Sequence, residues 1–300
     1  MRVSAVIPTL NGAATLPALL AALARERDAA RGLVEIVAID SGSRDGTRDL
    51  LAGAGARVLD LGGAPFGHGS ARNRAAAAAV GDVLLLLTQD VEPVGDAWLA
   101  PLLEALVEPR VAGAFGRQVP RGASLEEAFL ARVNYPGRPR WLGGEAVAAP
   151  AARFGPGATL FSDAFAVVRR AAWEAVPFPD LVMSEDQAWA LAVLRAGWEI
   201  RYEPRAEAWH GHRYGLARAF RRNFDSGSSL QRLGLAGGAW GAGAGHLLRE
   251  IRWVTAQGGA AALPHALLYE AVRMAAFHLG RLERFWPRAL ARRLGEAPRP

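Results

Sequence analysis

Asp90, His210 and His212 have the residue types and spacing needed to hold a divalent metal ion against a diphosphate. Asp90 follows the four leucines of residues 84–87 after Thr88-Gln89, and a single glycine separates the two histidines. Alternate residues of an extended segment point to the same side, so both imidazoles can face one site. Carboxylate oxygens and imidazole nitrogens suit Mn²⁺, and oxygen ligands suit Mg²⁺. The sequence therefore predicts a Mn²⁺ or Mg²⁺ site at Asp90 with one or both histidines, unless Asp90 caps a turn and the histidines lie on the surface.

Glu185 and Asp186 are adjacent acids in the first turn of a helix predicted over residues 184–196. Ser184 is expected to cap this helix, with Gln187 as its capping-box partner. A carboxylate at a helix start beside a ligand cleft can act as a general base. The plainer alternative is compensation of the helix dipole, which also favours acids in the first turn.

Alternating strands and helices position these residues. Apolar strands are predicted at residues 2–7, 33–39 and 84–87, and helices at 15–25, 45–54 and 70–80. This alternation is typical of an α/β fold with a mostly parallel, twisted sheet and helices on both faces. Such sheets bind ligands beyond the carboxyl ends of their strands. The side chains that follow each strand are therefore expected to meet at one edge.

Asp40 ends the second strand in the segment Asp40-Ser41-Gly42-Ser43. In a nucleotide-binding sheet a carboxylate at this place can accept hydrogen bonds from a base or ribose. It can equally serve as a turn or helix-capping aspartate, and the spacing alone does not decide between the two. Arg72 follows a glycine-containing segment and either pairs with phosphate or stays solvated.

Composition removes several kinds of chemistry. The 300 residues include no cysteine, and all 35 basic residues are arginine. Disulfides, thiolate metal sites, Schiff-base lysines and P-loop lysines are therefore excluded. The net charge of +6 is uneven, because residues 201–300 contain 16 arginines and seven acids. A basic final third can face an anionic membrane surface, a lipid diphosphate or nucleic acid.

The last third also contains helical stretches rich in Arg, Trp and Phe, predicted at residues 246–256, 265–282 and 287–294. They suit either an amphipathic surface that lies on a membrane or a helical cap packed on the sheet domain. No apolar run reaches the roughly 18–20 residues that span a bilayer. With no signal peptide at the N-terminus, the expectation is a cytoplasmic protein that can associate peripherally with the inner face of the membrane.

Taken in order, six motifs of residues 1–230 resemble family 2 glycosyltransferases of the GT-A fold. They are Pro-Thr-Leu-Asn, Asp-Ser-Gly-Ser-Arg-Asp-Gly-Thr, His-Gly-Ser-Ala-Arg-Asn, Thr-Gln-Asp-Val-Glu-Pro, Ser-Glu-Asp-Gln and His-Gly-His. The third and fourth are most similar to the rhamnosyltransferase-like branch. The resemblance implies a GT-A domain over residues 1–230, followed by a helical, basic extension over residues 231–300.

The resemblance also implies roles for individual residues. The donor nucleotide site is assigned to Pro8, Thr9, Leu10, Asn11, Asp40, Ser41, Arg72, Gln89 and Asp90. The catalytic base is assigned to Asp186, with Glu185 beside it. Asp90 is the expected metal ligand and His210 completes the site, although His212 can replace it. The family's Asp-x-Asp motif reads Thr88-Gln89-Asp90 here, so its first acid is missing.

The implied function is inverting transfer of a sugar from a nucleotide diphosphate, dTDP-rhamnose in this branch, to a hydroxyl of a glycan or lipid-linked acceptor. Such a reaction belongs to cell-envelope polysaccharide synthesis. A dinucleotide-dependent dehydrogenase is excluded because Gly-x-Gly-x-x-Gly is absent after the first strand. The segment after the first strand also lacks the glycine-rich basic loop of nucleotidyltransferases. No nucleic-acid-binding module is present, so a nucleic-acid partner is not expected. A non-catalytic nucleotide- or glycan-binding relative of the same fold is the alternative.

Overall fold

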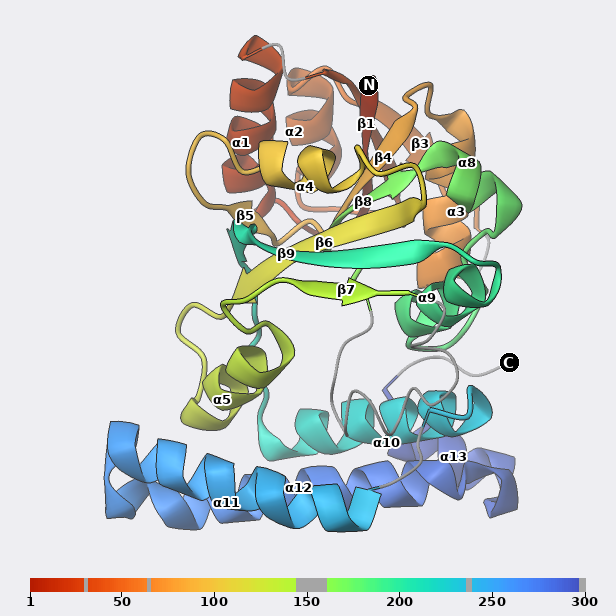
Figure 1. Ribbon diagram of the computed structural model, residues 1–300. Coiled ribbons are helices and arrows are strands. Elements are labelled where there is room, and N and C mark those ends of the chain that lie inside the picture. The colour runs from red at the N-terminus through yellow and green to blue at the C-terminus, as the bar shows by residue number, and fades with distance from the viewer. Residues whose placement is uncertain (30–31, 64–65, 144–160, 236–238, 297–300) are drawn as a thin grey trace.

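The computed structural model describes residues 1–29, 32–63, 66–143, 161–235 and 239–296, and its centre is one nine-stranded sheet (Figure 1). The strands follow the order β3 (Arg57–Asp60), β2 (Leu33–Asp40), β1 (Val3–Thr9), β4 (Val83–Leu87), β8 (Phe165–Arg169), β6 (Val111–Val119), β9 (Glu199–Trp209) and β5 (Glu92–Pro93), and β7 (Arg140–Leu142) pairs with β9. The helices that accompany the sheet are α1 (Leu16–Asp28), α2 (Thr47–Gly53), α3 (His68–Ala78), α4 (Ala100–Ala105), α5 (Leu125–Asn134), α8 (Arg170–Ala175) and α9 (Glu185–Arg195). The α/β fold and its first three predicted strands are confirmed.

Strand β4 shows how the sequence produces two core layers. Its side chains are all buried, and successive residues point to opposite faces of the sheet. Val83, Leu85 and Leu87 pack in the core that contains α1 and α4. Leu84 and Leu86 pack in the core that contains α3, α8 and α9. A strand covered on both faces needs a continuous apolar run, which is what the four leucines provide.

The sheet is parallel from β3 to β4 and reverses at β8. Strand β8 runs antiparallel to both β4 and β6, with Leu87 opposite Phe165. The amino end of β8 therefore lies where the parallel strands have their carboxyl ends. The amide of Thr88 donates to the carbonyl of Ala164 at 3.1 Å, which fixes the residues before β8 beside those after β4. This reversal brings residues 161–164 to the functional edge.

Four helices follow the sheet and lie together along one side of it (Figure 1). They are α10 (Leu216–Arg232), α11 (Ala239–Gly258), α12 (Leu263–Arg281) and α13 (Arg288–Leu294). Helices α10 and α12 lie in close contact, and two glycines make this possible. A Cβ at Gly227 would overlap the backbone carbonyl of Phe277, and a Cβ at Gly280 would overlap that of Phe224. Residue 230 lies inside α10, which packs on α12, and the division into domains at that residue stays a prediction. Within the described ranges, no helix combines the length and apolarity needed to cross a membrane.

Candidate active site

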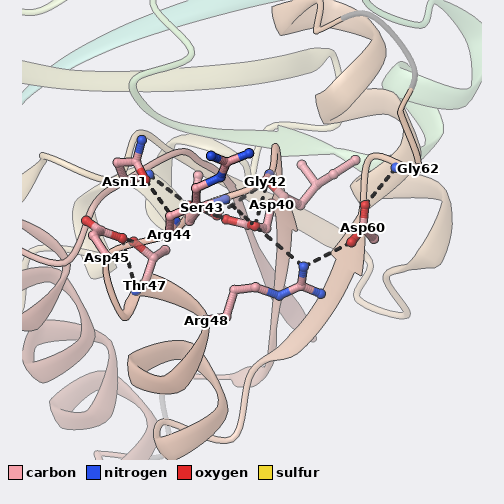
Figure 2. Close-up of polar contacts among 12 residues, drawn as sticks. Asn11, Asp40, Gly42, Ser43, Arg44, Asp45, Thr47, Arg48, Asp60 and Gly62 are labelled. Atoms are coloured by element: carbon pink, nitrogen blue, oxygen red, sulfur yellow. Dashed lines mark hydrogen bonds and ion pairs between the residues drawn. The ribbon is translucent and has the colours of Figure 1, made fainter.

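The loops that follow β1 and β2 are tied together by side chain to backbone hydrogen bonds (Figure 2). Asn11, with a left-handed φ of 48°, accepts from the Arg44 amide at 3.0 Å through its side-chain oxygen. Its own amide donates to the hydroxyl of Ser43 at 2.8 Å. The two loops therefore form one surface at the carboxyl edge of the sheet, beside the exposed side chain of Leu10.

Asp40 is fully buried at the centre of this network. Its carboxylate accepts from the amide of Ser43 at 3.0 Å and from the hydroxyl of Thr9 at 3.0 Å. Arg48 lies 3.8 Å away and bridges to Asp60 at 2.9 Å (Figure 2). Asp40 thus has the turn-forming role that was one of the two alternatives, while contact with a nucleotide base stays a prediction.

Gln89 joins the end of β4 to the end of β1. Its side-chain oxygen accepts from the Leu10 amide at 2.9 Å, and its side-chain nitrogen donates to the Leu10 carbonyl at 3.0 Å. An ionised carboxylate has no proton to donate, so an aspartate or glutamate here would lose one of these two bonds. Two other residues assigned to the donor nucleotide site lie at this edge of the sheet. Pro8 lies opposite Ile39 of β2, and the Ser41 amide donates to the Thr9 carbonyl at 2.9 Å.

Asp90, His210 and His212 meet in one cluster, as predicted from their spacing. The Nε2 atoms of His210 and His212 lie 3.6 Å and 3.3 Å from the Asp90 carboxylate. The potential ligand atoms of all three residues lie within 4.8 Å of one another. One carboxylate and two imidazoles are a suitable ligand set for a Mn²⁺-like ion. The residues present therefore fit the expected metal.

Gln118 orients His210, although no motif in the sequence marks Gln118 as part of the site. The side-chain oxygen of Gln118 lies 2.7 Å from Nδ1 of His210, and its nitrogen donates to the hydroxyl of Ser162 at 2.8 Å. Because an amide oxygen only accepts, Nδ1 must carry a proton, so Nε2 is the nitrogen left to donate to Asp90 or, once deprotonated, to bind a metal ion. Gln118 is buried, so this tautomer is fixed by the fold.

The charge states also suit metal binding. Burial acts to raise the pKa of Asp90, but a hydrogen bond from His210 and the positive charges that both histidines carry at acid pH outweigh burial and hold this pKa well below the usual range. Burial lowers the pKa of His212 in spite of the neighbouring Asp90. At neutral pH the cluster therefore offers an anionic carboxylate and a neutral His212, whose nitrogen lone pair is free to coordinate.

A second cluster gathers buried acids around one arginine. Arg72 is only 2% exposed, and its guanidinium contacts Asp163 at 2.9 Å and Glu185 at 3.2 Å. Both carboxylates are buried as well. Arg72 therefore compensates acids in this structure, and its predicted contact with the donor nucleotide stays a prediction. Asp163 had no signal in the sequence, because it reaches this cluster only through the reversal at β8.

Asp186 differs from Glu185 in its environment. Asp186 is half-buried and makes no ion pair in the described part of the chain, whereas Glu185 is buried against Arg72. Burial, followed by the charges of Asp163 and Glu185, raises the pKa of Asp186 well above the usual range for aspartate. Burial also raises the pKa of Asp163 to about 6, although Arg72 counteracts it. A raised pKa makes Asp186 a stronger proton acceptor once it is ionised.

The predicted capping box before Asp186 is wrong. Ser184 has a left-handed φ of 66°, and its side chain makes no capping hydrogen bond. The Gln187 side chain instead donates to the carbonyl of Phe161. A serine in this conformation is strained, and such strain is found where the surrounding structure holds a functional residue in place.

Ser162 and Asp163 connect the two clusters. Ser162 accepts from Gln118, which orients His210, while Asp163 pairs with Arg72 and lies near Asp186. The cluster of Asp90, His210 and His212 is thus joined to the acids around Arg72 through two consecutive residues at the amino end of β8. These two groups are called the metal-ligand cluster and the acid cluster below. A paired metal site and general base at the carboxyl edge of an α/β sheet can hold a diphosphate and activate a hydroxyl.

A model of the family "Glycosyl transferase family 2" matches residues 4–175. The chain belongs to this family. The chain is 28% identical over 292 residues to the O-antigen chain rhamnosyltransferase RfbN of Salmonella typhimurium. This alignment covers 94% of this chain and 90% of that protein. It is 29% identical over 260 residues to WbaN of Salmonella anatum, also an O-antigen chain rhamnosyltransferase, covering 82% and 79%.

Comparison with solved structures supports the GT-A fold. Glucosyl-3-phosphoglycerate synthase from Mycobacterium tuberculosis superposes with a TM-score of 0.53 at 21% identity, over 77% of this chain and 78% of that one. The predicted family and fold are therefore confirmed, and this protein is a family 2 glycosyltransferase. The roles of individual residues remain predictions.

The Arg72 cluster leads to a stability prediction. Arg72→Gln removes the guanidinium from two buried carboxylates, and breaking a buried ion pair in this way typically costs about 3–5 kcal/mol of unfolding free energy. Arg72 counteracts the raised pKa of Asp163, so without Arg72 this pKa rises further above its unfolded value. The loss should therefore grow as pH rises and shrink at acid pH, where the acids are protonated.

Urea unfolding of Arg72→Gln and wild type at pH 8 and pH 5 measures this effect. Arg74→Gln is the matched control on the same helix, because Arg74 is exposed and donates to the backbone carbonyls of Leu61 and Asp60. An equal loss of unfolding free energy in the two variants, or a loss that does not depend on pH, would contradict the role of Arg72 as the cation that compensates the buried acids.

Proposed function

We propose that this glycosyltransferase moves a sugar from a nucleotide diphosphate to a hydroxyl of a glycan or lipid-linked acceptor, with inversion at the anomeric carbon and with a divalent metal. One observation carries the proposal: the Ser162-Asp163 connection between a metal-ligand cluster and an aspartate of raised pKa. The first cluster would hold the diphosphate end of the donor. The second would receive the proton of the acceptor.

The roles follow from charge. Asp186, once ionised, would take the proton of the acceptor hydroxyl as its oxygen attacks the sugar. Glu185 and Asp163 would keep Asp186 basic, and Arg72 would keep their combined charge tolerable inside the protein. Asp90 with His210 and His212 would hold Mn²⁺ or Mg²⁺, which when bound neutralises negative charge on the departing diphosphate. The network of Asn11, Asp40 and Ser43 would shape the nucleotide pocket.

The proposed donor is dTDP-rhamnose, and the proposed setting is synthesis of a cell-envelope polysaccharide. Two relatives with 28% and 29% identity are O-antigen chain rhamnosyltransferases, and they match most of this chain. Their identity is low, so the donor needs a direct test. The mycobacterial synthase has been solved with Mn²⁺ and uridine diphosphate, which is consistent with a metal-assisted donor site on this fold.

Asp186→Asn tests the proposed base. The asparagine keeps the size of the side chain but cannot accept the proton, so turnover should fall by about 10²–10⁴-fold. Binding of dTDP-rhamnose with Mn²⁺ should change little. The wild-type base works only when it is ionised, so kcat/KM of the wild type should rise with pH. The pKa read from this rise should lie above the usual pKa of an aspartate.

Release of dTDP from dTDP-rhamnose across pH, and calorimetric binding of the donor, measure the two effects. Glu174→Gln changes an exposed acid on α8 and serves as the control. Full turnover in Asp186→Asn would rule out its role as the base. Donor binding that appears with another nucleotide sugar but not with dTDP-rhamnose would reject the donor and leave the base assignment standing.

Gln118 offers a test of the metal site that does not depend on turnover. Gln118→Leu removes the acceptor that fixes the tautomer of His210, and losses of this kind typically weaken metal affinity by about 10–100-fold. Gln118→Glu keeps an acceptor oxygen at the same distance and should retain the affinity. Mn²⁺ titration followed by electron paramagnetic resonance measures both variants, and unchanged affinity in Gln118→Leu would contradict the role of Gln118.

We also propose that the C-terminal helices contact an anionic membrane surface, where a lipid-linked acceptor would lie. Exposed apolar side chains include Leu268 on α12 and Phe285 and Leu290 next to and on α13. Exposed arginines, including Arg284 and Arg288, lie between them in sequence. Apolar and basic side chains together are typical of interfacial helices.

Sedimentation with vesicles tests this contact. Binding to vesicles rich in anionic lipid should fall with rising salt, because exposed charges are screened. The double variant Phe285→Ser, Leu290→Ser should bind less, whereas Val107→Ser, at an exposed apolar residue after α4, should bind as wild type. Equal binding to neutral vesicles, or equal loss in both variants, would argue against the proposal.

A further inference from the structure

Helices α11 and α12 carry a second cluster of potential metal ligands, away from the sheet. His246 and Glu250 are one turn apart on α11, so they lie on the same face of that helix. Glu270 comes from α12, which lies beside α11 (Figure 1). The nearest potential ligand atoms of the three residues lie within 4.8 Å of one another. Ligands bound at about 2.0–2.2 Å around one ion are separated by distances of this order.

Glu250 points to a missing partner. Its side chain is 1% exposed, and neither carboxylate oxygen has a hydrogen-bond partner within the described part of the chain. An ionised carboxylate without water or a donor is costly, so a buried one is normally paired, protonated or bound to a metal. The lack of a partner for this buried carboxylate is therefore evidence for a ligand in its own right, in addition to the clustering of the three residues.

Two basic side chains of this region pair with other carboxylates. Arg273 contacts Glu270 at 2.6 Å, and His265 contacts Glu126 of α5 at 2.9 Å. The carboxylate of Glu250 makes no hydrogen bond to either of them. One imidazole and two carboxylates, with their ligand atoms this close together, are a suitable ligand set for a metal ion.

We propose that His246, Glu250 and Glu270 form a structural site for a first-row divalent metal, with Zn²⁺ as the best fit. Mixed nitrogen and carboxylate ligands favour Zn²⁺ over Mg²⁺ or Ca²⁺, which prefer oxygen alone. The ion would fasten α11 to α12. It is distinct from the Asp90 cluster in sequence, in location and in its proposed role.

The proposed ion would also steady the donor-site histidines. Glu127, next to Glu126 on α5, accepts from the hydroxyl of Tyr269 on α12 at 3.2 Å. The same oxygen accepts from the amide of Tyr214 at 2.8 Å. Tyr214 lies two residues after His212 in the chain. Fixing α12 therefore fixes the support of the segment that carries His210 and His212.

Zinc binding by the full chain tests the proposal. The measurement uses protein freed of metal with a chelator, in an Asp90→Asn, His212→Gln background that disables the donor-site cluster. Titration with ZnCl₂ against a chromophoric chelator, together with melting curves, should show one zinc ion per chain and a rise in Tm, because a ligand of the native state stabilises it.

Glu250→Gln and His246→Gln in that background should abolish both the zinc uptake and the rise in Tm. Without metal, Glu250→Gln should melt no lower than its parent, since the amide buries no charge. This expectation separates loss of metal from failure to fold. His278→Gln, at a histidine near the end of α12, is the matched control and should bind zinc like the parent.

Absence of zinc uptake in the background protein would overturn the proposal. So would uptake that neither Glu250→Gln nor His246→Gln reduces. Loss of uptake in both variants, with the control unchanged, would establish the site. None of these outcomes depends on donor binding or turnover, so they are distinguishable from failure of the proposed function.

Discussion

The guanidinium of Arg72 is the interaction on which the acid side of the site depends. It contacts two buried carboxylates, Asp163 and Glu185, and Asp186 lies within their electrostatic influence. Three acids in one buried region cannot all ionise without a cation close by. Arg72 makes the arrangement possible, and the remaining excess of negative charge raises the pKa of Asp186. The arginine is therefore a positioning and charge-balancing residue for the proposed base.

Neutral amides have a corresponding role on the metal side. Gln118 fixes the tautomer of His210, and Gln89 clips the loop after β4 to the loop after β1. In both cases the side-chain oxygen accepts a hydrogen bond, and the side-chain nitrogen of Gln89 also donates one to the Leu10 carbonyl. The missing first acid of the family motif is thus accompanied by two histidines near Asp90 and by a network that holds one of them in a ligating form. This gives a physical account of how a site with one carboxylate can suit a metal.

The C-terminal helices extend this arrangement away from the sheet. Glycines at 227 and 280 let α10 and α12 approach closely, and Glu127 ties α12 to the segment that follows the histidines. The position of α12 is therefore coupled by packing and hydrogen bonds to the segment that carries His210 and His212. Glu250 of α11 is buried, and neither of its carboxylate oxygens has a hydrogen-bond partner in the described part of the chain, which packing alone does not explain.

The sequence by itself determined the family, the α/β core and the residues that end the strands. Four consecutive leucines predict a strand buried on both faces, and polar residues directly after parallel strands must meet at one edge. These are local patterns, so Asp90, His210, His212 and the Glu185-Asp186 pair were accessible from the chain alone. Only the tertiary structure decided the partners. Asp163 and Gln118 enter the site because β8 runs antiparallel to β4 and β6, and that pairing depends on long-range packing. For the same reason Arg72 and Asp40 could be placed near the site from sequence, but their hydrogen bonds and ion pairs could not.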